Sequence, residues 1–283
     1  MDITQKIIQW AKEESSIRAL ILQGSRAANR SIDEFSDYDI SVFCSTSQPY
    51  TETENWLAGI GVVWVCVKEK ISCKGQMFPT RLVIFENGIK VDFSFFPLDS
   101  LHQMSNEPLP NEYNRGYQIL LDKDNLTQKL PKPNYQEPKA QKPSSLQFLE
   151  TIEEFWFEAY HVAVYLKRED LWSVKLRSAS MHIFLLKIIE WEAQARHGWR
   201  QMPPPIEKRM VSWIQPGLWQ ELHGIFAHFD ASDSWDALFH TLSLFRRLSI
   251  ELSHQFGFDY PTALDQNMSH FIMTLRKGPH AAT

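Results

Sequence analysis

The spacing of hydrophobic residues changes along the first half of the chain between a helical and a strand-like period. Apolar residues three and four positions apart predict a helix over Ile3 to Glu14 and another near Thr51 to Ala58. Glu86-Asn87-Gly88 is typical of a hairpin turn. Apolar, β-branched or aromatic runs predict strands at Ile17 to Leu22, Tyr38 to Cys44, Val62 to Val67, Arg81 to Phe85 and Ile89 to Phe95. We therefore predict a mixed α/β sheet domain in this half.

The second half carries long helical patterns after a proline-rich break. The segment Asp122 to Pro143 loses periodicity and holds several prolines among Lys, Gln and Asn, as a crossing segment between domains does. Helices are predicted at Phe148 to Val162, Leu171 to Ala195, Trp235 to Phe256 and Pro261 to Leu275, with the run Pro203 to Pro205 interrupting them. The fold class is thus predicted as α+β, with a mixed-sheet domain over residues 1–135 and a helical bundle domain over residues 136–283.

Composition and charge narrow the class of protein. Apolar residues make up 43% and charged residues 22% of 283 residues, a globular balance with enough length for two cores. No apolar run approaches the ~20 residues of a membrane span, and Met1 to Lys6 lacks the features of a secretory signal, so we expect a cytoplasmic protein with no membrane partner. The net charge of -5 disfavours a nucleic-acid partner and suits a cationic ligand.

Gly24-Ser25-Arg26 stands at the end of the first predicted strand. Glycine allows close backbone approach, serine adds a hydroxyl, and a following helix would point free N–H groups at an anion, so this turn could cradle a phosphate. Taken alone, a Gly-Ser pair after a strand is more often an ordinary turn.

Three aspartates give that turn a chemical context. Asp37 and Asp39 lead a buried-type strand, and residues two apart on a strand point the same way, so both carboxylates can bend onto a shared Mg²⁺. Asp92 lies in a strand of apolar residues, on the same face as Lys90 and Ser94. Buried acids are rare unless paired or bound to metal, whereas a solvent-facing acid is the alternative for each aspartate alone. Together the three indicate a two-metal site for phosphoryl transfer.

These motifs resemble the nucleotidyltransferase superfamily. Gly24-Ser25-Arg26, the stretch Asp33 to Ile40, and Val91-Asp92 carry the superfamily pattern. Segments of the second half are similar to the helical domain of the aminoglycoside 6-adenylyltransferases, antibiotic-resistance enzymes that modify streptomycin: Glu154 to Trp156, Tyr165 to Asp170, Leu185 to Lys187, Glu190-Trp191 and Phe258 to Pro261. The resemblance covers nearly the whole chain.

What the resemblance implies is transfer of AMP from ATP to a hydroxyl of an aminoglycoside, with release of pyrophosphate. Asp37 and Asp39 would hold Mg²⁺, with two ions expected. Asp92 would be a shared metal ligand or would accept the hydroxyl proton, and both roles stay open. Gly24, Ser25 and Arg26 would contact the triphosphate.

The helical domain would supply the remaining contacts. Lys175 is the candidate for reaching the distal phosphates, with a plain surface lysine as the alternative. The substrate would lie in the cleft between the domains, where Glu154, Trp156 and Glu158 could receive cationic amino or guanidino groups. A tryptophan at helical spacing is, however, more often part of a core.

One segment departs from the family pattern. After Trp191 the family tends to carry a Gly/Lys-containing stretch, whereas this chain runs from Arg196 to Met202 into the three prolines, which leaves the substrate open. The alternatives are a nucleotidyltransferase that acts on another small molecule or on a protein, and a non-catalytic nucleotide-binding regulator. Retention of Gly24, Ser25 and all the carboxylates argues against the regulator. The sequence does not indicate an oligomeric state.

Overall fold

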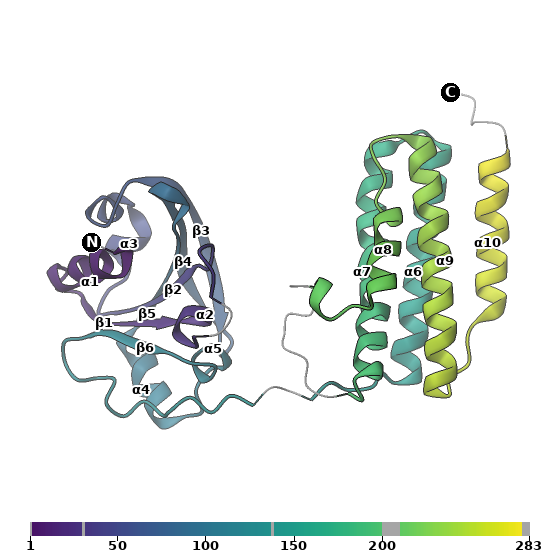
Figure 1. Ribbon diagram of the computed structural model, residues 1–283. Helices are drawn as coiled ribbons and strands as arrows, with labels where there is room; N and C mark the ends of the chain where they lie inside the picture. Colours follow the sequence, from purple (N-terminus) through teal and green to yellow (C-terminus); the bar gives the residue numbers. More distant parts are fainter. Residues whose placement is uncertain (1, 30–31, 137–138, 200–209, 279–283) are drawn as a thin grey trace. The chain divides into compact units, whose positions relative to one another are not determined.

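The computed structural model describes residues 2–29, 32–136, 139–199 and 210–278, and it divides into two compact units, Met1–Gln136 and Glu137–Thr283 (Figure 1). The first unit is built on a mixed sheet and the second is helical, which confirms the predicted α+β fold class. The proline run at 203–205 lies outside the described residues. None of the described helices is both long and apolar enough to cross a membrane.

A six-stranded sheet with the strand order β3-β4-β5-β2-β1-β6 is the frame of the first unit. Its strands are β1 (Ile17–Gln23), β2 (Tyr38–Cys44), β3 (Val63–Cys73), β4 (Gln76–Phe85), β5 (Lys90–Pro97) and β6 (Gln118–Asp122). β2 and β5 are parallel, and the other neighbouring strands are antiparallel. The antiparallel pairing of β4 with β5 confirms the hairpin predicted at Glu86-Asn87-Gly88, where Asn87 and Gly88 both have positive φ.

Some elements of this unit differ from the prediction. β3 and β4 extend beyond the predicted ranges and form one long hairpin that turns at Lys74-Gly75. Pro79 has no backbone N–H to donate. It is tolerated in β4 because the pairing of β4 with β5 begins only at Thr80, so no β5 residue is paired with Pro79. The single helix predicted near Thr51 to Ala58 is wrong. The chain forms the short helix α3 (Gln48–Glu52), is extended at Thr53, and then makes a 3-10 turn, η1 (Asn55–Gly59).

Helices cover both faces of the sheet. α1 (Ile3–Glu13) packs on one face, together with η1, against alternate side chains of β1, β2 and β5. On the opposite face, α4 (Leu98–Asn106) and α5 (Asn111–Asn114) pack against the intervening residues of the same strands. Because side chains alternate along a strand, Asp39 and Asp92 point to the face that carries α4 and α5.

The second unit is a bundle of four long helices that run alongside one another (Figure 1). They are α6 (Ser145–Lys167), α7 (Leu171–Arg196), α9 (Ala231–Phe256) and α10 (Thr262–Lys277), joined by the short helix α8 (Pro216–Leu222) and the 3-10 turns η3 (Met210–Ser212) and η4 (His223–Ile225). All four predicted helices are confirmed. Ser144 begins α6 with a capping box, in which its hydroxyl accepts from the backbone N–H of Gln147 and the Gln147 side chain accepts from the backbone N–H of Ser144.

Candidate active site

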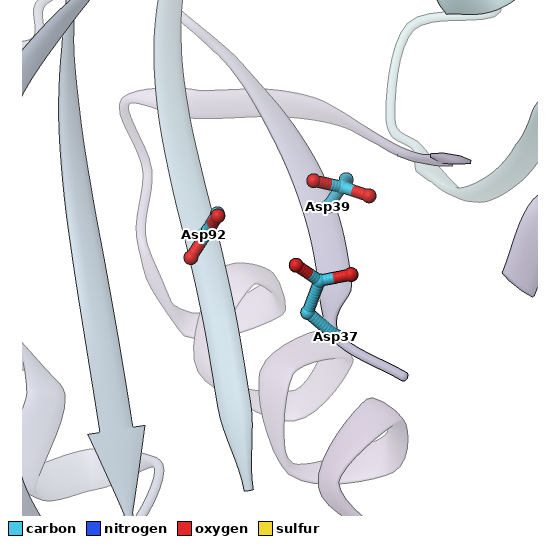
Figure 2. A group of neighbouring side chains, drawn as sticks. All are labelled: Asp37, Asp39 and Asp92. Atoms are coloured by element: carbon cyan, nitrogen blue, oxygen red, sulfur yellow. The ribbon is translucent and has the colours of Figure 1, made fainter. Parts of the chain in front are cut away.

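The three predicted carboxylates converge at the ends of two neighbouring strands. The parallel register of β2 and β5 places Asp39 directly beside Asp92, and Asp37 immediately precedes β2. Figure 2 shows Asp37 and Asp39 following one another along one strand, with Asp92 on the next. One oxygen from each side chain lies within 4.8 Å of the other two, which is close enough for a shared cation.

Lys90 already provides a positive charge at this cluster. Its Nζ donates a hydrogen bond of 2.8 Å to Asp37 and another of 2.8 Å to Asp92. Burial lowers the pKa of the Lys90 ammonium, but the two hydrogen bonds outweigh burial, so this pKa is raised above its ordinary value. The sequence carried the signal for this contact, because Lys90 and Asp92 share one face of a strand, but Lys90 was not selected as a site residue.

Asp92 is more enclosed than Asp37. Its side chain is 19% exposed, against 37% for Asp37. Burial raises the pKa of Asp92, and hydrogen bonding to Lys90 opposes this effect only in part. The second oxygen, Oδ1, is buried and accepts no hydrogen bond from the described residues. An acceptor oxygen enclosed in this way is costly unless a cation or a donor joins it, so the carboxylates fit a bound metal ion.

Gly24 lies against Asp39 at the end of β1. Gln23 pairs with Asp39 across the β1–β2 ladder, and the short helix α2 (Gly24–Ala27) follows at once. Gly24 has a φ of +74°, and a Cβ atom there would lie 2.0 Å from Oδ2 of Asp39. The glycine is therefore needed both for its backbone conformation and for the space that the carboxylate occupies.

Arg26 holds the segment that leads into Asp37. Its Nε and Nη2 both donate to the backbone carbonyl of Ser36, at 2.9 and 2.7 Å, and its guanidinium lies 4.0 Å from the ring centroid of Tyr38. Asp33 accepts from the hydroxyl of Ser36 in the same turn. In this structure Arg26 positions the carboxylates, and its contact with a phosphate stays a prediction.

Lys175 is engaged within the helical unit. Its Nζ donates to the carbonyl of Ala227 at 3.0 Å, to the hydroxyl of Ser234 at 2.9 Å and to the carbonyl of His228. An ammonium has three donors, and these three acceptors use them all. The structure thus gives Lys175 a role in anchoring the turn before α9, and its reach to the distal phosphates stays a prediction.

The predicted substrate residues of α6 do not share one surface. Glu154 is exposed and lines a hollow of about 280 Å³ with Glu150, Glu153 and Phe157. Trp156 is 0% exposed and belongs to the core, since residues two apart on a helix point in nearly opposite directions. Glu158 is 8% exposed and forms an ion pair of 3.1 Å with Arg177. The predicted helix is confirmed, but the spacing of apolar residues does not reveal that Glu158 is buried and paired with Arg177 of α7.

Known proteins resemble this chain over nearly its whole length. The sequence profile of the streptomycin adenylyltransferase family matches residues 1–275. The chain is 25% identical to an aminoglycoside 6-adenylyltransferase of Campylobacter jejuni, over 96% of this chain and 93% of that protein. It is 26% identical to one of Bacillus subtilis (strain 168), over 92% and 91%. A crystal structure of an aminoglycoside 6-adenyltransferase from Bacillus subtilis aligns with 98% of this chain and 100% of that one, at 21% identity and a TM-score of 0.47.

Proposed function

The chain belongs to the streptomycin adenylyltransferase family, a family of nucleotidyltransferases, and from this we propose that it transfers AMP from ATP to a hydroxyl of an aminoglycoside, with streptomycin as the first candidate. The observation that carries the proposal is the convergence of Asp37, Asp39 and Asp92, whose oxygens lie within 4.8 Å of one another. The full-length similarity to proteins named aminoglycoside 6-adenylyltransferase supports the class of acceptor.

The carboxylates supply the ligands that the reaction needs. Asp37, Asp39 and Asp92 would hold Mg²⁺, for which carboxylate oxygens are suitable ligands. When bound, Mg²⁺ would supply positive charge that neutralises the charge developing on the nucleotide phosphates during in-line attack. Lys90 would add a second positive charge to the site, since its ammonium donates hydrogen bonds to two of the three acids.

The transfer makes one bond and breaks one. The acceptor hydroxyl oxygen attacks the α-phosphorus of ATP, the bond from that phosphorus to the bridging oxygen breaks, and pyrophosphate leaves with the electron pair. The hydroxyl proton passes to a base at the site. Asp92 is our candidate both for that base and for a shared metal ligand, because its carboxylate lies beside Asp37 and Asp39 and its Oδ1 is buried with no hydrogen bond from the described residues. Gly24 and Ser25 would contact the triphosphate beside Asp39, and Glu154 would contact the acceptor.

Pyrophosphate release from ATP and Mg²⁺ tests the proposal. It is measured with streptomycin, with other aminoglycosides and with no acceptor, for the wild type and for Asp39→Asn. Release that requires an aminoglycoside and falls by about 10³-fold or more in the variant would support the proposal. Nucleotide binding with no transfer to any aminoglycoside would overturn it, and turnover with another small molecule or a protein would reassign the acceptor.

A further inference from the structure

The sheet face that carries the carboxylates continues without interruption onto the β3–β4 hairpin. Across the ladder, Asp92 pairs with Leu82 of β4, and Leu82 pairs with Val67 of β3. Directly cross-strand residues share a face, so these side chains form one row with Asp39 at its other end. Val67 is 44% exposed, so the described helices of the first unit leave its side chain partly uncovered.

Glu69 stands in the next row of the same face. It pairs with Thr80, which pairs with Ser94 of β5, two residues beyond Asp92. The strand spacing of ~4.8 Å and the rise of ~3.3 Å per residue put the Cα atoms of Glu69 and Asp92 roughly 12 Å apart.

The carboxylate of Glu69 forms no ion pair with any of the described residues. Lys68 and Lys70 flank it in sequence and therefore point to the opposite face of the strand. Lys68 forms its ion pair with Glu54, at 3.3 Å. Within the part of the chain that the structure describes, no hydrogen bond or ion pair to Glu69 is found.

The surroundings of Glu69 select for one kind of ligand. Leu82 and the buried Thr80 of β4 lie between Glu69 and Asp92 on this face, and Val67 lies beside Glu69 on β3. The side chains of Leu82 and Val67 suit the apolar C–H faces of linked sugar or cyclitol rings. An uncompensated carboxylate at the far end attracts an ammonium or guanidinium group and repels phosphate. This end of the face therefore favours a cationic acceptor over the nucleotide.

We propose that Glu69 is a specificity-determining residue that binds an amino or guanidino group of the acceptor while the reacting hydroxyl lies at Asp92. This inference rests on the proposed function, and it names the part of the site that distinguishes a cationic acceptor from a neutral one. Glu69 acts on acceptor binding, with no part in nucleotide binding or in the chemical step.

The test compares Glu69→Gln with Glu13→Gln, which makes the same charge change on α1, at the opposite face of the sheet. Streptomycin binding is measured by calorimetry, and KM for streptomycin, KM for ATP and kcat are measured by pyrophosphate release. We expect Glu69→Gln to weaken streptomycin binding by roughly 5- to 30-fold and to raise its KM equally, because one charge-assisted hydrogen bond is lost. KM for ATP and kcat should not change, and Glu13→Gln should match the wild type.

Two further readouts separate recognition from a structural effect. Glu69→Asp should recover most of the affinity, and the dependence of streptomycin binding on salt should be weaker in Glu69→Gln than in the wild type. Equal affinity in Glu69→Gln and wild type, or an equal rise in KM for ATP, would overturn the inference. A wild type that binds streptomycin without turnover defeats the proposed function alone, and calorimetry still decides the role of Glu69. A wild type that neither binds nor modifies any aminoglycoside defeats both.

Discussion

Replacement of Gly24 by alanine should lower kcat about 10²-fold while leaving the protein folded. The added Cβ would lie 2.0 Å from Oδ2 of Asp39, whereas ordinary contact begins at 3.4 Å. Either the carboxylate or the turn must therefore move by about 1.4 Å, since both sit on a short, directly paired piece of β1 and β2. A misplacement of about 1 Å at a reacting centre costs about 10²-fold in rate, so we expect kcat to fall by about that factor, or about 2.7 kcal/mol.

The same substitution also strains the backbone, and a substitution at a second glycine gives the cost of this strain separately. A non-glycine residue in the left-handed region costs about 1–2 kcal/mol, which lowers the unfolding temperature of a unit of this size by about 3–8 °C. Gly88 has nearly the same φ, +73° against +74°, but a Cβ there would meet nothing within 4 Å. Gly88→Ala therefore carries the strain without the contact, and it is the matched control.

Pyrophosphate release and thermal unfolding of the two variants decide the question. Gly24→Ala should lose at least as much stability as Gly88→Ala, because it adds the contact with Asp39 to the same backbone strain, and only Gly24→Ala should lose activity. If Gly24→Ala keeps the wild-type kcat, or if Gly88→Ala loses as much activity, the contact between Gly24 and Asp39 does not position the carboxylate, and the reasoning above is wrong.

Three other substitutions test contacts in the helical unit. Lys175→Met should lower the unfolding temperature, because it removes the donor to Ala227 and Ser234, and it should leave KM for ATP within about twofold. A raised KM for ATP with unchanged stability would return Lys175 to the nucleotide site. Burial lowers the pKa of His182 from 6.5 to about 4, so the unfolded chain takes up the proton first, and the stability present above pH 6.5 is lost as the pH falls toward 4. His182→Gln should reduce that pH dependence in urea unfolding, and an identical dependence would contradict it. Glu154→Gln should raise KM for the aminoglycoside and spare KM for ATP, and an unchanged drug KM removes Glu154 from the site.

The carboxylate cluster could be predicted from sequence because local rules determine it. The two-residue period of a strand places Asp37 and Asp39 together, and an isolated acid in an apolar strand marks Asp92. Their meeting depends on the parallel pairing of β2 with β5, which no short-range pattern encodes and which the sequence analysis did not predict. For the same reason the contact between Gly24 and Asp39 was not foreseen, since it joins the ends of two strands.

The sequence could not predict which side chains are buried where packing between helices or strands decides their exposure. Trp156 and Glu158 lie on a correctly predicted helix, but their burial depends on the other helices of the bundle and on Arg177 of α7. The contacts of Lys175 could not be predicted from the sequence because its three acceptors come from residues more than fifty positions later. The strand β6 begins at Gln118 with a polar residue at the sheet edge, and its stability comes from pairing with β1, which composition does not reveal.

The edge strand β3 also limits which substitutions this protein can accept without losing solubility. Among the described strands, β3 is bonded to the sheet only through β4, so its other side forms a sheet edge with backbone N–H and C=O groups that another strand could pair with. Its first half exposes Trp64, Val65 and Val67, a composition that favours aggregation, and the charged run Lys68-Glu69-Lys70 follows directly. Those charges keep two copies from pairing edge to edge. Mutations that exchange Glu69 for an apolar residue to accept a different drug would therefore also reduce solubility, and the range of acceptors open to natural selection is limited by colloidal stability as well as by recognition.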